Sequence, residues 1–260
     1  MLFISKGIIA TKLVFVNFLL TSILGRDNIQ VNKRLPQKEN PMTKRRPIKS
    51  RSNPMIVRLA KWLSQKNITP NQISLFSILP AFIAMIALAF WQISTHLSVQ
   101  IILLAIAIVG IQLRLLCNLI DGMVAIEGGK VTPAGELFNE VPDRVSDTLF
   151  FVGLGLSLGS PTGLALGLLA SLFAAFTAYI RVLGVSMGSP AFFSGPFAKQ
   201  HRMALMTIAL FGTIIGLFFN AGTVLLWGAI IIIIAGSFIT ALRRLVQIYR
   251  FKNQEAILSK

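Results

Sequence analysis

The acidic side chains of this chain are concentrated in one short stretch. The sequence has only nine Asp and Glu, against 25 Lys and Arg. Six of the nine lie between residues 118 and 147: Asp121, Glu127, Glu136, Glu140, Asp143 and Asp147. Carboxylate and amide oxygens are the ligands that a hard divalent cation such as Mg²⁺ prefers. The stretch is therefore a candidate metal site. The alternative, that acids simply favour a helix N-terminus, explains Glu136 but not Asp121, which ends the preceding apolar run.

Helical spacing places the polar residues of this stretch on two faces. The first face is made of Asn118, Asp121, Gly122 and Ala125, with Arg114 one turn earlier. The second is made of Gly135, Asn139, Asp143 and Asp147, flanked by Glu136 and Glu140. We expect the two faces to meet at the boundary between membrane and cytoplasm, where the small residues let a ligand approach the backbone.

The elements that must position these faces are long apolar helices. Hydrophobic residues make up 54% of the chain and charged residues 13%. A helix that crosses a membrane needs about 20 mainly apolar residues, and a membrane barrel would need short alternating strands instead. Six apolar runs meet the helical requirement: 74–93, 98–120, 144–159, 161–184, 203–219 and 222–242. The sequence therefore predicts an all-α membrane protein with a six-transmembrane-helix bundle.

The distribution of Lys and Arg predicts the orientation of this bundle. Residues 33–66 hold eleven basic residues, whereas the turns near 94–97, 160 and 220 hold none. Basic loops stay in the cytoplasm, so both ends and the acidic stretch are predicted to face it, at the cytoplasmic membrane. The net charge of +16 then favours anionic membrane lipid as a partner. Aromatic residues are not interleaved with the N-terminal basic ones, so a nucleic-acid partner is not favoured.

The segment before the first span divides into two parts. Residues 1–54 are an apolar segment followed by a basic linker that we expect to be flexible. Residues 55–65 place Met55, Leu59 and Trp62 on one helical face and Arg58 and Lys61 on the other. This pattern predicts an interfacial amphipathic helix on the cytoplasmic leaflet, with a soluble helix packed on a partner as the alternative. We expect a membrane domain over 55–250 and a basic tail over 251–260.

The spacing of the acidic stretch resembles the signature of the CDP-alcohol phosphatidyltransferases, D-x2-D-G-x2-A-R-x8-G-x3-D-x3-D. The matching residues here are Asn118, Asp121, Gly122, Ala125, Ile126, Gly135, Asn139 and Asp143. The frame is intact, and the resemblance covers roughly residues 55–245, including "ITPNQIS" at 68–74. Asparagine replaces aspartate at 118 and 139, and Ile126 replaces the arginine.

The resemblance implies an enzyme of phospholipid biosynthesis that transfers a phosphatidyl group from CDP-diacylglycerol to an alcohol and releases CMP. It implies Asp143 as the catalytic base and Mg²⁺ or Mn²⁺ as cofactor. The implied metal ligands are Asn118, Asp121, Asn139 and Asp143, and Glu140 could restore a missing carboxylate. The nucleotide would lie against Gly122, Ala125 and Gly135. Basic residues beside the site predict an anionic acceptor, such as a phosphorylated alcohol, held by Arg181, Lys199 and Arg202.

The two asparagines leave two questions open. They lower the charge of the four signature positions from −4 to −2, so the site could hold one metal ion or two. The alternative function is a catalytically silent relative that binds nucleotide-activated lipid or scaffolds lipid enzymes. The sequence leaves the acceptor alcohol and a homodimer open as well.

Overall fold

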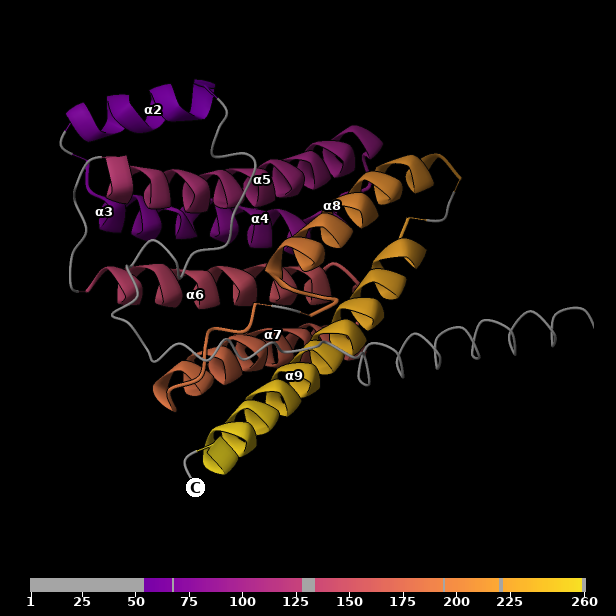
Figure 1. Ribbon diagram of the computed structural model, residues 1–260. Helices are drawn as coiled ribbons and strands as arrows, with labels where there is room; N and C mark the ends of the chain where they lie inside the picture. Colours follow the sequence, from indigo (N-terminus) through magenta and orange to yellow (C-terminus); the bar gives the residue numbers. More distant parts are fainter. Residues whose placement is uncertain (1–53, 67, 128–133, 194, 220–221, 259–260) are drawn as a thin grey trace, which may run out of the picture. The chain divides into compact units, whose positions relative to one another are not determined.

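The computed structural model describes residues 54–66, 68–127, 134–193, 195–219 and 222–258, and the elements in these ranges are helical (Figure 1). The expectations for the N-terminal segment and for the loop around Lys130 lie outside the described residues. In chain order the helices are α2 (Pro54–Gln65), α3 (Pro70–Phe76), α4 (Ile78–Phe90), α5 (Leu97–Glu127), α6 (Gly135–Leu156), α7 (Pro161–Ser186), α8 (Lys199–Gly216), the 3₁₀ turn η2 (Leu217–Phe219) and α9 (Val224–Leu258).

Several of these helices are long and apolar enough to cross a membrane. Among the described residues there are five such stretches: Pro70–Phe90, Leu97–Ala125, Pro161–Ser186, Lys199–Phe219 and Val224–Ile257. The remaining predicted span, 144–159, is helical as far as Leu156, where α6 ends. The first half of α6 carries the acidic face, which lowers its mean hydropathy. The all-helical membrane class is thus confirmed, and the number six stays a prediction.

The entry to the first span is capped. The Thr69 hydroxyl accepts a hydrogen bond from the Gln72 backbone N–H at 3.3 Å, and the Gln72 side chain accepts one from the Thr69 N–H at 2.9 Å. Pro70 occupies the first turn, where its missing N–H costs nothing. The reciprocal bonds satisfy two backbone donors that a helix start otherwise leaves without partners.

Two compact units make up the chain, and the larger contains the helices that carry the acidic stretch. Its described part is 54–176 and 199–234, apart from the gaps given above. In it α4 packs between α5 and α6 (Figure 1). The approach of α4 to α5 is close, since a Cβ on Gly110 would lie 2.6 Å from the carbonyl oxygen of Pro80. Small residues at such contacts let helix backbones pack tightly, as membrane helices require.

Helix α2 packs on α5 within the larger unit. Ala60 is buried, and Ile56 and Leu63 pack with it against a cluster that includes Ile120 of α5. Trp62, like Met55 and Leu59, remains exposed. The helix therefore has one apolar strip on the protein and a second one facing outward. Its position on a lipid leaflet stays a prediction.

The smaller unit is formed by 177–198 and 235–258, the C-terminal parts of α7 and α9 with the segment after α7. Arg244 of α9 is buried and donates to the backbone oxygen of Thr177 at 2.6 Å. Ile180, Ala241 and Ile248 form its apolar core. Helix α9 continues to Leu258, so most of the predicted C-terminal tail belongs to this helix.

We predict that position 130 is reachable from the cytoplasm only. In a Cys117→Ser background, Lys130→Cys should react with a membrane-impermeant maleimide in inverted vesicles but not in intact cells. The reason is that basic loops are retained on the cytoplasmic side. Ser160→Cys, in a turn without basic residues, is the matched control and should show the opposite pattern. Labelling of position 130 from outside alone would contradict the orientation.

Candidate functional site

The candidate site lies within the larger unit and is built by three helices. Helix α5 supplies Arg114, Asn118 and Asp121, helix α6 supplies Asp143, Ser146 and Asp147, and the start of α8 supplies Lys199 and Arg202. The spacing of three or four residues within each helix puts its contributors on one face. The N-terminal half of α6 thus meets cationic side chains from two other helices.

Asp143 is the centre of the site. Its Oδ1 accepts hydrogen bonds from Arg114 Nη2 at 2.6 Å, from Asn118 Nδ2 at 2.9 Å and from Lys199 Nζ at 2.5 Å. Arg144 Nη2 lies 3.7 Å from the other oxygen. Burial raises the pKa of Asp143, but Lys199 and Arg114 outweigh it and hold the pKa below its usual value. The side chain is therefore a carboxylate fixed by donors from α5 and α8.

Asp147, one turn further along α6, forms a second ion pair with α8. Its Oδ2 lies 3.1 Å from Arg202 Nη2, and the two side chains are only 3% and 2% exposed. Its other oxygen, Oδ1, is 3.9 Å from Lys199 Nζ and has no hydrogen-bond partner among the described residues. Charges removed from water to this extent must be paired, so this pair ties α6 to α8.

Arg114 connects α5 to α6. It is 1% exposed and donates to Ser146 Oγ at 2.7 Å as well as to Asn118 Oδ1 and Asp143. The sequence places Arg114 on the polar face of α5, but neither Arg114 nor Asp147 was among the predicted metal, catalytic or acceptor-binding residues. The signal that could have found Arg114 is an arginine in the middle of an apolar run, because such residues are costly and usually functional.

The structure brings together only some of the predicted metal ligands. Asn118 and Asp143 are in contact. Asp121 is buried but accepts from Ser74 Oγ of α3 at 2.5 Å. Asn139 is exposed, and Glu140 pairs with Arg144 at 3.2 Å. The rotation of each helix is set by the elements packed against it, so residues predicted to share a helical face need not converge on one metal site.

The other predicted site residues are placed as follows. Ala125 is buried, whereas Gly122 and Gly135 are partly exposed, on the predicted faces of α5 and α6. Lys199 contacts Asp143 at 2.5 Å, and Arg202 contacts Asp147 at 3.1 Å. Arg181 belongs to the smaller unit, where its guanidinium lies 5.2 Å from the ring centre of Phe193.

The oxygen donors of the site suit a divalent cation whose remaining ligands come from a substrate and from water. Among the described residues, no three Asp, Glu, His or Cys side chains converge closely enough to hold a metal alone. Mg²⁺ is commonly bound through one or two carboxylates together with substrate phosphates and water. The carboxylates of Asp121 and Asp143 and the amide of Asn118 are oxygen donors of this kind. Asp147 Oδ1 is a further buried oxygen without a hydrogen-bond partner in the described part of the chain.

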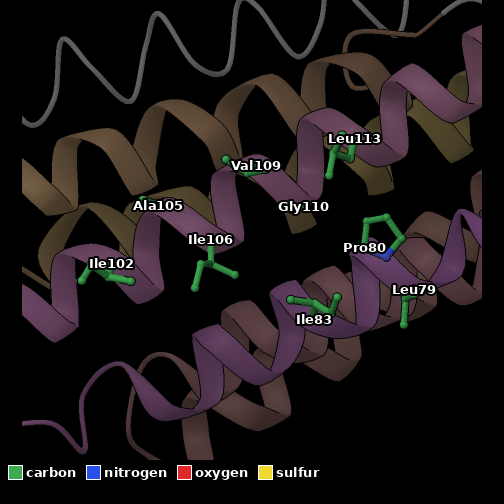
Figure 2. Close-up of a pocket in the computed structure, with 9 residues that line it drawn as sticks. All are labelled: Leu79, Pro80, Ile83, Ile102, Ala105, Ile106, Val109, Gly110 and Leu113. Carbon is green, nitrogen blue, oxygen red and sulfur yellow. The ribbon is translucent and has the colours of Figure 1, made fainter.

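An apolar pocket of about 500 Å³ lies between α4 and α5 (Figure 2). Figure 2 shows Ile83 of α4 and Ile106 of α5 extending toward the same space. Leu113, at one end of the lining, immediately precedes Arg114, so pocket and polar site follow each other along α5. The complete lining is Leu79, Pro80, Ile83, Ile102, Ala105, Ile106, Val109, Gly110 and Leu113.

The chain is similar in structure to phosphatidylinositol phosphate synthase (PgsA1) of Mycobacterium tuberculosis. With the structure in complex with manganese and citrate the TM-score is 0.59 at 19% identity, covering 75% of this chain and 88% of the synthase. With the structure that has CDP-DAG bound, the TM-score is 0.58 at 19% identity, covering 75% of this chain and 94% of the synthase. With the apo form, the TM-score is 0.60 at 17% identity, covering 74% of this chain and 95% of the synthase. No protein-family model and no curated protein matches the sequence. At these identities, the likeness establishes that the chain shares the fold of these synthases.

Proposed function

We propose that this protein transfers a phosphatidyl group from CDP-diacylglycerol to an alcohol and releases CMP, in phospholipid biosynthesis at the cytoplasmic face of the cytoplasmic membrane. The observation that carries the proposal is Asp143, a largely buried carboxylate held by donors from α5 and α8. It stands at the last position of the signature spacing, in a chain with the fold of a synthase solved with CDP-DAG bound. The spacing, the carboxylate and the fold support the same reaction.

We propose Mg²⁺ or Mn²⁺ as the cofactor, and the synthase solved with manganese supports this choice. Asn118, Asp121 and Asp143 would hold the ion, and Asn139 and Glu140 remain candidates from the sequence. A bound divalent cation would neutralise the diphosphate and stabilise charge on the leaving CMP. In this proposal Gly122, Ala125 and Gly135 leave room for the nucleotide.

The chain's own residues would move the proton and orient the acceptor. Asp143 would take the proton of the acceptor hydroxyl while that oxygen attacks the lipid-bound phosphorus. The bond to the bridging oxygen of the diphosphate then breaks, and CMP leaves with the electron pair. Lys199, 20% exposed and 2.5 Å from Asp143, must exchange this contact for another before the carboxylate can accept the proton. The phosphate of an anionic acceptor would be such a partner, and it would recruit Lys199 away from the base.

The remaining predicted contacts concern the two ends of the substrates. Arg202, bound to Asp147, is proposed to help orient an anionic acceptor, and Arg181 keeps the same role as a prediction from the sequence. The apolar pocket between α4 and α5 is proposed to take an acyl chain of the CDP-lipid, because it begins one residue from Arg114. The side chains that line this pocket are apolar, so an acyl chain could enter it without leaving a polar side chain unpaired.

One observation favours the alternative function. The buried acids Asp143 and Asp147 are already paired with Arg114, Lys199 and Arg202. A relative that has lost turnover would retain such a self-neutralised site and bind the nucleotide-activated lipid without transferring its phosphatidyl group. CMP release separates the two functions directly.

The proposal is tested by incubating the purified protein with labelled CDP-diacylglycerol, Mg²⁺ or Mn²⁺, and a panel of free and phosphorylated alcohols. We expect CMP release that requires both the cation and an acceptor. Asp121→Ala should abolish cation-dependent binding of the CDP-lipid, because the site has few carboxylates to lose. Glu136→Ala, which removes an exposed acid of α6, is the matched control and should leave binding unchanged. Binding of the CDP-lipid without CMP release, for every alcohol, would favour the silent relative.

A further inference from the structure

Arg114 lies where the acids of the site converge. Its guanidinium is buried and bonds Asn118 Oδ1 on its own helix and Asp143 Oδ1 on α6. A third contact, to Ser146 Oγ at 2.7 Å, fixes its orientation. A positive charge is thus held between two positions that the signature spacing assigns to metal ligands.

Asn118 is matched to this arrangement in a way that aspartate would not be. Its amide accepts from Arg114 through Oδ1 and donates to Asp143 through Nδ2 at 2.9 Å. A carboxylate at position 118 could not donate, and it would repel the carboxylate of Asp143 unless a cation such as the guanidinium of Arg114 lay between them. The amide and the guanidinium together make a second cation unnecessary.

The charge balance of the site also argues against a second metal ion. Its buried and partly buried ionisable groups are four acids and four bases: Asp121, Glu140, Asp143 and Asp147, and Arg114, Arg144, Lys199 and Arg202. Four charges of each sign cancel, so the site is neutral without any metal. A CDP-lipid brings a diphosphate with two negative charges, and one divalent cation balances it. A second cation would leave two positive charges in excess within a largely desolvated site, where such an excess is costly.

We propose that Arg114 is a built-in cation of this site, so that the site takes one divalent cation per bound CDP-lipid. The inference rests on the proposed function and deepens it by defining the composition of the loaded site. Binding of the cation and of the diphosphate is then mutually dependent, because neither alone leaves the site neutral.

The test is to count bound Mn²⁺ in the full-length protein, using the electron paramagnetic resonance signal of free Mn²⁺, with and without CDP-diacylglycerol in lipid nanodiscs. We expect one ion per chain with the CDP-lipid present and an affinity at least tenfold weaker without it. Two ions per chain, or an unchanged affinity without the lipid, would overturn the inference and leave the proposed function intact. Bound CDP-lipid with no Mn²⁺ would overturn the inference as well.

Two variants keep the result specific to Arg114. The double variant Arg114→Gln/Asn118→Asp removes the guanidinium and adds a carboxylate, and it should bind a second Mn²⁺. Asn118→Asp alone retains the guanidinium and should still bind one ion, which also covers the case in which the double variant fails to fold. A second ion in Asn118→Asp alone would overturn the role of Arg114. Failure of the wild type to bind the CDP-lipid at all would overturn both the inference and the proposed function.

Discussion

Asp143→Asn is expected to reduce CMP release by about 10²–10⁴-fold, the usual contribution of a positioned general base. The substitution keeps the size of the side chain and one of its oxygens, so it can still accept from Arg114 and Asn118. It removes the negative charge that draws the proton from the acceptor hydroxyl. The initial rate of CMP release, measured at saturating CDP-diacylglycerol and acceptor, reports this loss directly.

The control for this variant is Glu136→Gln, which neutralises an acid on the same helix that is exposed rather than held by donors. Its rate should match that of the wild type. Folding of Asp143→Asn is checked independently by its thermal unfolding profile. Undiminished CMP release in a folded Asp143→Asn would rule out this residue as the base, together with the mechanism built on it.

Arg202→Met is expected to lower the free energy of unfolding by about 3–5 kcal/mol, because it leaves the carboxylate of Asp147 buried without its ion-pair partner. The pair is almost fully inaccessible and joins α6 to α8 at 3.1 Å. Lys199, 3.9 Å from the other oxygen, can compensate only in part, since it is already bound to Asp143. Thermal unfolding in detergent, followed by tryptophan fluorescence, measures the effect.

The double variant Arg202→Met/Asp147→Leu is the matched control. Replacing both members of a buried ion pair by apolar side chains is often neutral, so most of the lost stability should return. A double variant no more stable than Arg202→Met alone would show that the buried charge of Asp147 is not the cause. In that case the methionine would be disrupting the packing of α8 itself.

The sequence by itself determined the helical class and the local order of the site. Its apolar runs coincide with α4, α5, α7, α8 and α9. The reason is that a membrane-spanning helix requires only a continuous run of apolar residues, which is a local pattern. The start of α3 has the same local origin, since the cap made by Thr69 and Pro70 involves only neighbouring residues. The common face of Asn118 and Asp121 follows from 3.6 residues per turn alone.

Only the tertiary structure decided which of these side chains meet. The two polar faces meet in part, where Arg114 and Asn118 of α5 contact Asp143 of α6, but α4 packs between the two helices elsewhere. Asp121 is therefore bound by Ser74 of α3, while Arg114 reaches Asp143 on α6. Lys199 joins Asp143 across 56 positions of the chain. Partners so distant depend on how each helix is rotated in the packed bundle, which is set by contacts along its whole length and not by the residues of the site.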